Sequence, residues 1–123
     1  MCSSDLSRID ILLERNGGER CYVEVKSTTL VEGTQARFPD AVTKRGLKHL
    51  MELRDMVREG HRAVIFFCVS RSDVTTFAPA DDIDPAYGKA LREVVAQGVD
   101  AMAWSTHVEP DRFSLLKPLA IEL

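Results

Sequence analysis

The chain has 123 residues, of which 45% are hydrophobic, and its formal net charge is −3. This length allows one domain with a buried core, but the negative charge argues against a generally basic nucleic-acid binder, because nonspecific affinity comes from neutralising phosphates. Any contact with DNA must therefore come from a local cationic patch.

Membrane, secretion and metal–thiol sites are not indicated. The sequence has no run of about 18 apolar residues and no basic segment followed by an apolar stretch at its start, so neither a membrane span nor a secretory signal is predicted. Its cysteines, Cys2, Cys21 and Cys68, lie far apart without a C-x-x-C pair, which argues against a zinc site or a disulfide framework. We therefore expect a cytoplasmic protein without membrane contact.

The first predicted element is a β-hairpin whose two strands flank the glycine-rich segment 16–18. Asp10 lies in the first strand, and the sequence Glu-Val-Lys at 24–26 lies in the second. Because successive side chains of a strand point to opposite faces, Glu24 and Lys26 should project from the same side of the sheet. A carboxylate and an ammonium are thus expected at one place.

The turn decides whether Asp10 faces Glu24. With a three-residue loop, Arg15 pairs with Glu19. The same register then places Asp10 opposite Glu24. A two-residue turn at 17–18 instead puts Asp10 on the other face of the sheet, and the sequence leaves both turns open.

Two opposed carboxylates would favour a metal ion between them. Cβ atoms of opposed residues lie roughly 5 Å apart, so Asp10 and Glu24 would repel each other without a cation or a proton. Magnesium is the natural candidate, because it takes one or two protein carboxylates plus waters and phosphate oxygens. Lys26 would then stabilise the charge of a phosphodiester under attack. The alternative is an ordinary exposed Glu–Lys pair, which spacing alone favours because E-x-K is common on half-exposed strands.

A long helix is predicted after a loop at 31–35. It begins at 39–40, with Asp40 as its cap, and runs to about Glu59. Gly46 inside this helix indicates a close approach of the backbone to a neighbour or to a phosphate. The predicted buried stripe contains Leu47, Leu50, Leu53 and Val57, and another face contains Arg45, Lys48, His49 and Glu52.

The second half of the chain predicts a strand, a helix and a strand. Residues 62–70 are almost continuously apolar, as in a central strand covered on both faces. Asp84 followed by proline predicts a capped helix that ends at Gly98, and 99–107 returns as a strand. This order implies a right-handed crossover and a parallel pair of strands. Because the opening hairpin is antiparallel, the whole sheet is expected to be mixed. A last short strand is predicted at 113–116.

Seven segments carry a family resemblance. They are SRIDILL at 7–13, YVEVKSTTL at 22–30, FPDAVTKRGLKHL at 38–50, GHRAV at 60–64, FAPA at 77–80, IDP at 83–85 and QGV at 97–99. Together they closely resemble the sugar fermentation stimulation protein A family. The resemblance implies an α/β fold with a mixed sheet flanked by helices. This is a restriction-endonuclease-like (PD-(D/E)xK) core, here lacking its first helix and strand.

The resemblance also implies a division of the chain. Residues 1–6 do not resemble the family and are expected to be an artefactual leader. Residues 7–123 correspond to the nuclease-like C-terminal domain of the family. The OB-type domain that precedes it in the family is not expected within this sequence.

Members of the family are described as DNA-binding proteins linked to sugar metabolism. The resemblance implies a nuclease-like triad of Asp10, Glu24 and Lys26, in which Asp10 and Glu24 bind Mg²⁺ or Mn²⁺. DNA is the expected partner. Its backbone would be engaged from the long helix by Lys44, Arg45, Lys48 and His49.

Three functional interpretations follow. The first is a metal-dependent DNA nuclease. The second is a non-catalytic DNA-binding regulator of sugar metabolism genes, against which the intact triad argues, because a cluster of like charges is costly without its metal. The third is an inert fragment. For the cationic residues of the helix the alternative is a solvated face, and a single helical histidine such as His49 is more often structural than a base. The oligomeric state is left open, a homo-oligomer included.

Overall fold

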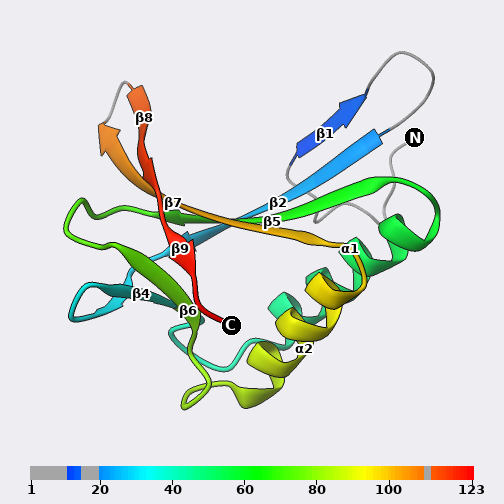
Figure 1. Ribbon diagram of the computed structural model, residues 1–123, viewed down its shortest axis with the longest axis horizontal. Coiled ribbons are helices and arrows are strands. Elements are labelled where there is room, and N and C mark those ends of the chain that lie inside the picture. Colours follow the sequence, from blue (N-terminus) through cyan, green and yellow to red (C-terminus); the bar gives the residue numbers. More distant parts are fainter. Residues whose placement is uncertain (1–10, 15–19, 110–111) are drawn as a thin grey trace.

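The described part of the chain forms two mixed β-sheets and two helices (Figure 1). The computed structural model describes residues 11–14, 20–109 and 112–123. One sheet has the strand order β1-β2-β5-β7-β8, and the other has the order β3-β4-β6-β9. The strands are β1 (Ile11–Glu14), β2 (Arg20–Thr28), β3 (Leu30–Glu32), β4 (Gln35–Phe38), β5 (Arg62–Val69), β6 (Thr76–Pro79), β7 (Asp100–Glu109), β8 (Arg112–Pro118) and β9 (Ala120–Ile121), and the helices are α1 (Lys44–Arg58) and α2 (Pro85–Ala96).

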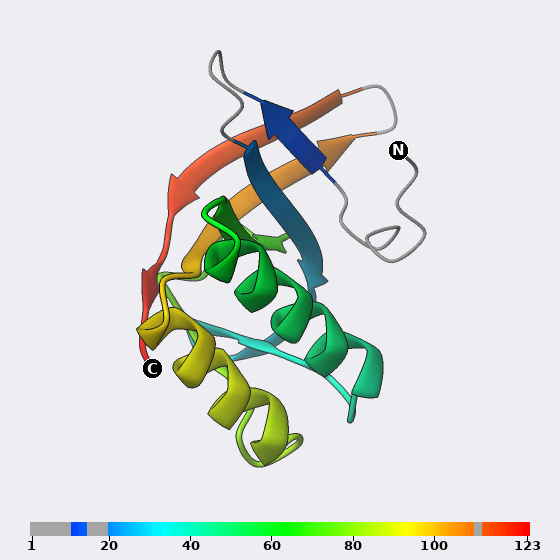
Figure 2. The same ribbon diagram turned by 90° about the vertical axis from the view of Figure 1, so that its right-hand side faces the viewer.

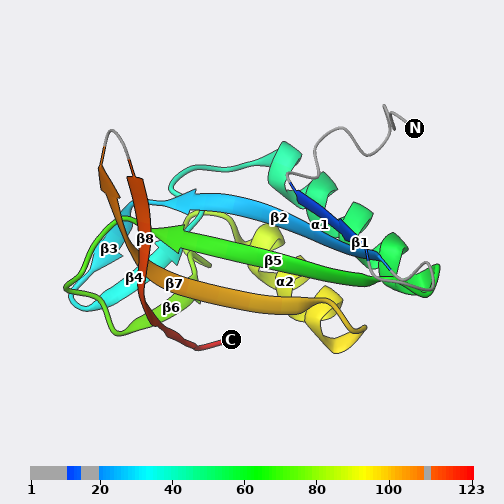
Figure 3. The same cartoon turned by 90° about the horizontal axis from the view of Figure 1, so that it is seen from above.

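Strand β5 lies at the centre of the five-stranded sheet (Figure 3). Apart from its first residue and the half-buried Phe66, its side chains are buried. It runs parallel to both β2 and β7. The predicted central strand and the parallel pair connected through a helix are therefore confirmed. Strands β1 and β8 flank this parallel core as antiparallel strands, so the sheet is mixed as predicted.

The hairpin of β1 and β2 has the register expected from a three-residue loop. Ile11 pairs with Val23, and Glu14 pairs with Arg20. Residues 15–19, which contain the predicted turn, and Asp10 lie outside the described residues. The paired residues nevertheless decide between the two registers left open by the sequence, because a two-residue turn would have paired Ile11 with Glu24 instead of Val23.

Both helices cover the same face of the five-stranded sheet (Figure 2). Helix α1 packs against β2, β5 and α2. The predicted stripe of α1 is confirmed, with Leu50 and Leu53 fully buried and Leu47 and Val57 packed against the core. The described helices are too short and too polar to cross a membrane. Other core residues are Tyr22, Ile65, Phe67, Phe77, Tyr87, Leu91 and Val94.

The predicted start of α1 is wrong by several residues. The helix begins at Lys44, and its N-cap is Thr43 rather than Asp40. The Thr43 hydroxyl accepts a hydrogen bond from the backbone N–H of Gly46 at 2.9 Å, which satisfies one of the free donors at the helix start. Asp40 is exposed in the preceding loop. The second helix is as predicted, with Asp84 as N-cap and proline in its first turn.

The predicted loop at 31–35 is a β-hairpin. Strands β3 and β4 pair as antiparallel strands around Gly33, which has a φ of 64° that suits glycine. Strand β6 joins β4 in parallel, so Ala36 lies beside Phe77, and both side chains are fully buried. These strands are short, and their pairing depends on residues about 40 positions apart in the sequence. No local pattern could therefore have indicated the second sheet.

Candidate active site

Glu24 and Lys26 lie on the side of β2 that faces the helices. Tyr22, Glu24 and Thr28 are buried, whereas the alternate residues Val23 and Val25 are only half-buried. This alternation confirms the predicted projection of Glu24 and Lys26 from one side. Glu24 is only 3% exposed, so the two residues do not form the ordinary surface pair that spacing alone favoured.

A third side chain reaches this place from α1. Nδ1 of His49 lies 2.6 Å from Nζ of Lys26 and 3.2 Å from Oε2 of Glu24. Nζ of Lys26 lies 3.2 Å from the same carboxylate oxygen. The three groups therefore form a closed triangle of polar contacts, which we call the Glu24–Lys26–His49 cluster.

The ammonium of Lys26 sets the direction of its contact with His49. A lysine ammonium has three donors and no acceptor, so the short contact requires Nδ1 of His49 to accept the hydrogen bond. Nζ of Lys26 also forms an ion pair with Oε2 of Glu24 at 3.2 Å. This arrangement holds the ammonium at one point.

The structure separates His49 from the other cationic residues of α1. Lys44, Arg45 and Lys48 are exposed, whereas His49 is only 2% exposed. The sequence contained a signal for this difference, because His49 follows Gly46 by three residues and precedes Leu53 by four, which places all three on the buried face. We therefore assign His49 to the cluster, while Lys44, Arg45 and Lys48 form an exposed cationic surface on the first turns of α1.

Tyr87 is a buried neighbour of the cluster that sequence analysis did not assign to a site. It belongs to the first turn of α2, and its ring packs edge-on against Phe38 with centroids 5.2 Å apart. Burial, and then the negative charges of Glu24 and Asp84, raise the pKa of Tyr87 far above its usual value. The hydroxyl is therefore protonated and able to donate. Among the described residues it has no hydrogen-bond partner.

Gly46 of α1 makes room for Tyr87. A Cβ atom built on Gly46 would lie 3.2 Å from Cε2 of Tyr87 and 2.8 Å from Cγ2 of Thr43. This confirms the close approach of backbone and neighbour expected from a glycine inside the helix. The neighbour is α2 rather than the sheet.

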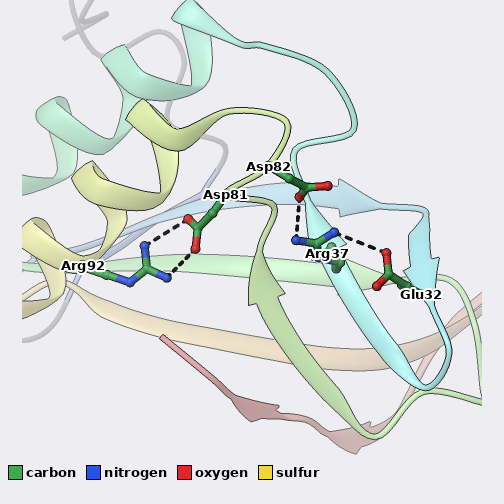
Figure 4. Close-up of polar contacts among 5 residues, drawn as sticks. All are labelled: Glu32, Arg37, Asp81, Asp82 and Arg92. Carbon is green, nitrogen blue, oxygen red and sulfur yellow. Dashed lines mark hydrogen bonds and ion pairs between the residues drawn. The ribbon is translucent and has the colours of Figure 1, made fainter.

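Two ion-paired arginines connect the loop before α2 to its surroundings (Figure 4). Arg92 makes two hydrogen bonds to Asp81, at 3.0 and 2.8 Å. Arg37 lies 2.7 Å from Asp82 and 3.6 Å from Glu32. The arginine hydrogen bonds lower the pKa of Asp81 and of Asp82. These carboxylates thus connect the loop to α2 and β4 and lie apart from the cluster.

One group of the cluster, the Glu24 carboxylate, is a ligand of the kind that magnesium takes. Among the described residues, no group of three His, Cys, Asp or Glu side chains is arranged to hold a metal. Magnesium, however, commonly takes only one or two protein carboxylates, and waters and phosphate oxygens complete its shell. Glu24 supplies one carboxylate. The second predicted ligand, Asp10, lies outside the described residues.

The chain matches one known protein family along most of its length. The family model described as "Sugar fermentation stimulation protein RE domain" matches residues 2–112. A sugar fermentation stimulation protein homolog from Geobacter sulfurreducens is 55% identical over 94% of this chain. A homolog from Shewanella piezotolerans is 50% identical over 98% of it. The chain spans about half of these relatives, 49% and 51% of their lengths.

A solved structure is also similar. It is described as the structure of Pyrococcus furiosus SfsA in complex with Ca²⁺, and it is 34% identical, with a TM-score of 0.84. The match covers 94% of this chain and 50% of that one. These comparisons confirm the predicted resemblance and the restriction-endonuclease-like fold.

Proposed function

The chain belongs to the sugar fermentation stimulation protein family, and on this premise we propose that it carries a metal-dependent phosphodiesterase site that acts on DNA. The observation that carries the proposal is the buried Glu24–Lys26–His49 cluster, in which a carboxylate, an ammonium and an imidazole meet within 3.2 Å of one another. Charged groups are rarely buried together without a function or a counter-ion.

In this proposal Glu24 and Asp10 hold Mg²⁺ or Mn²⁺. The register of β1 supports it, because Ile11, the neighbour of Asp10, pairs with Val23, the neighbour of Glu24. The Pyrococcus furiosus relative, which is described as a complex with Ca²⁺, supports a divalent cation in this family. When bound, such an ion lowers the pKa of a coordinated water and offsets charge on a phosphoryl group.

Lys26 is the residue of the cluster that would meet the phosphate. Its side chain is 13% exposed, compared with 4% for Glu24 and 2% for His49. Since its ammonium contacts both Nδ1 of His49 and the Glu24 carboxylate, Lys26 is held in one orientation before the substrate arrives. A preorganised cation stabilises negative charge as it develops, without having to reorient at that moment.

The exposed cationic surface of Lys44, Arg45 and Lys48 would bind the DNA backbone. These residues lie on the first turns of the helix that also carries His49. A bound phosphate chain would therefore run beside the cluster. The first turn of α1 contains no acidic side chain that would repel it.

A second candidate function is DNA binding without cleavage, as in a regulator of sugar metabolism genes. The observation that favours it is the hydrogen bond of Lys26 with His49 together with its ion pair with Glu24, because a site whose charges already offset each other can persist without a metal ion. On this alternative the cluster would stabilise the packing of α1 on the sheet.

The deciding experiment is cleavage of plasmid and single-stranded DNA with Mg²⁺, with Mn²⁺ or with a chelator. Wild-type chain is compared with Glu24→Gln, which keeps the size of the side chain, and with Lys26→Ala. Lys89→Ala, an exposed lysine of α2, serves as the control. Metal-dependent cleavage by wild type and Lys89→Ala, but not by Glu24→Gln or Lys26→Ala, would establish the phosphodiesterase activity. If all four proteins bind DNA and none cleaves it, the non-catalytic regulator is the remaining function.

A further inference from the structure

The hydroxyl of Tyr87 is a buried donor that the proposed chemistry has not yet used. Tyr87 is fully buried, and its Oη atom has no hydrogen-bond partner within the described part of the chain. Buried polar groups in native proteins are almost always paired, either with protein atoms or with ordered water. A buried hydroxyl therefore indicates a partner that is neither a side chain nor a backbone group of these residues.

Contacts of both its backbone and its ring hold Tyr87 in position. Its backbone N–H donates to Oδ1 of Asp84 at 3.1 Å, and its ring lies between Phe38 and the backbone of Gly46. Asp84 in turn accepts from the backbone N–H of Thr43 at 3.0 Å, so the starts of α1 and α2 move together. Such constraints on backbone and ring direct the hydroxyl to one place.

That place lies toward the Glu24–Lys26–His49 cluster. Tyr87 packs against Gly46 of α1, and His49, three residues further along the buried face of the same helix, lies 3.2 Å from Oε2 of Glu24. Phe38, which packs against Tyr87, also packs against Phe67, the residue that pairs with Lys26 in the sheet. The hydroxyl is therefore a buried donor in the same layer as a buried carboxylate. Water is the partner that fits both, because a buried water molecule usually makes about three hydrogen bonds and can accept from Tyr87 while it donates to a carboxylate.

We propose that Tyr87 is a positioning residue of the metal site, which donates its hydroxyl to a buried water molecule beside Glu24 that belongs to the hydration shell of the divalent cation. This inference rests on the proposed function. Magnesium and manganese keep several waters when they bind proteins, and groups that orient such waters tune metal affinity without touching the ion.

The test is Mn²⁺ binding to the 123-residue chain by isothermal titration calorimetry, with Tyr87→Phe compared to wild type. This change removes one oxygen and leaves the ring packing in place. The control is Tyr22→Phe, since Tyr22 is the chain's other tyrosine, buried on the same side of β2 against His61. Glu24→Gln defines the loss of a direct ligand. Thermal unfolding in chelator is measured for all four proteins.

We expect Tyr87→Phe to weaken Mn²⁺ binding about 10-fold, with no fall in melting temperature in chelator, and Tyr22→Phe to leave the affinity unchanged. Equal Mn²⁺ affinity of wild type and Tyr87→Phe would overturn the role of Tyr87 and leave the metal site itself intact. Absence of Mn²⁺ binding to wild type, as to Glu24→Gln, would overturn both this inference and the metal-dependent function on which it rests.

Discussion

The carboxylate of Asp84 and the backbone of Thr43 connect the starts of the two helices. Asp84 is the N-cap of α2, and its Oδ2 atom lies 3.0 Å from the backbone N–H of Thr43, the N-cap of α1. One buried side chain thus satisfies a donor in each helix start. Because His49 is carried by α1 and Tyr87 by α2, this contact sets the position of both relative to Glu24.

Replacing Asp84 should therefore lower the free energy of unfolding by more than the removal of a single helix N-cap does. Asp84→Ala removes two hydrogen bonds to buried donors, and we expect a loss of about 2 to 4 kcal/mol in the free energy of unfolding, measured by urea titration. Asp84→Asn keeps one acceptor oxygen and should lose less. Asp40→Ala is the matched control, since Asp40 is exposed and does not cap α1. Equal losses in Asp84→Ala and Asp40→Ala would contradict the shared cap.

His49 should act through its Nδ1 acceptor. His49→Ala leaves Lys26 without this partner, and misplacement of a catalytic group by about 1 Å can cost about 100-fold in rate. We expect DNA cleavage by His49→Ala to fall by about 10- to 100-fold. His49→Asn places an amide oxygen near the position of Nδ1, so it should recover much of the activity. Equal activities of the two variants, at equal melting temperatures, would exclude this role.

Gly46 should resist a change that normally stabilises helices. Glycine inside a helix costs about 1 kcal/mol relative to alanine, so Gly46→Ala would ordinarily help. Here the added methyl group meets Thr43 and Tyr87 at 2.8 and 3.2 Å. We expect a net destabilisation of about 1 to 3 kcal/mol, measured by thermal or urea unfolding. Alanine at the exposed Arg45 position of the same helix should be nearly neutral, and a stabilised Gly46→Ala protein would show that α2 gives way.

The exposed cationic surface of α1 should control the salt dependence of DNA binding. Each lysine or arginine that neutralises a phosphate contributes about 0.9 to the slope of log affinity against log salt on duplex DNA. Removing Lys44, Arg45 or Lys48 singly should lower that slope by about 1 and weaken binding to all sequences alike. Fluorescence anisotropy at several salt concentrations measures the effect. An unchanged slope in all three variants, with Lys89→Ala as reference, would place the DNA elsewhere.

The ion pair of Asp81 and Arg92 should contribute to stability only above acid pH. Hydrogen bonds from Arg92 lower the pKa of Asp81 in the folded protein, so the unfolded chain takes up the proton first as the pH falls. The contribution is complete above the ordinary carboxyl pKa of about 3.9 and disappears as the pH drops through the lower, folded-state pKa. Melting temperatures recorded between pH 6 and pH 2, about the range around that pKa, should therefore fall less steeply for Arg92→Ala than for wild type. An identical decrease of melting temperature with falling pH in Arg92→Ala and wild type would contradict this role of the ion pair.

Several features followed from sequence patterns alone. The alternation of side chains on β2 placed Glu24 and Lys26 on one side, and the glycine-rich segment at 16–18 allowed the register that the described strands adopt. The proline after Asp84 marked the start of α2, and the apolar run in β5 marked the centre of the sheet. Each of these depends on residues close together in the chain, whose periodicity or backbone preferences are readable without a partner.

Other features of the fold and of the candidate site depend on contacts between distant segments, and only the tertiary structure decided them. Strands β4 and β6 are short and pair across about 40 residues, so the second sheet has no local pattern. The spacing of His49 from Gly46 and Leu53 indicated the buried face of α1, but only the packing of α1 on β2 brought His49 to Glu24 and Lys26. The ring of Tyr87 packs against α1 only because Gly46 leaves space for it. The sequence by itself thus determined the family and two residues of the candidate site, whereas burial, set by long-range packing, decided which further side chains meet them.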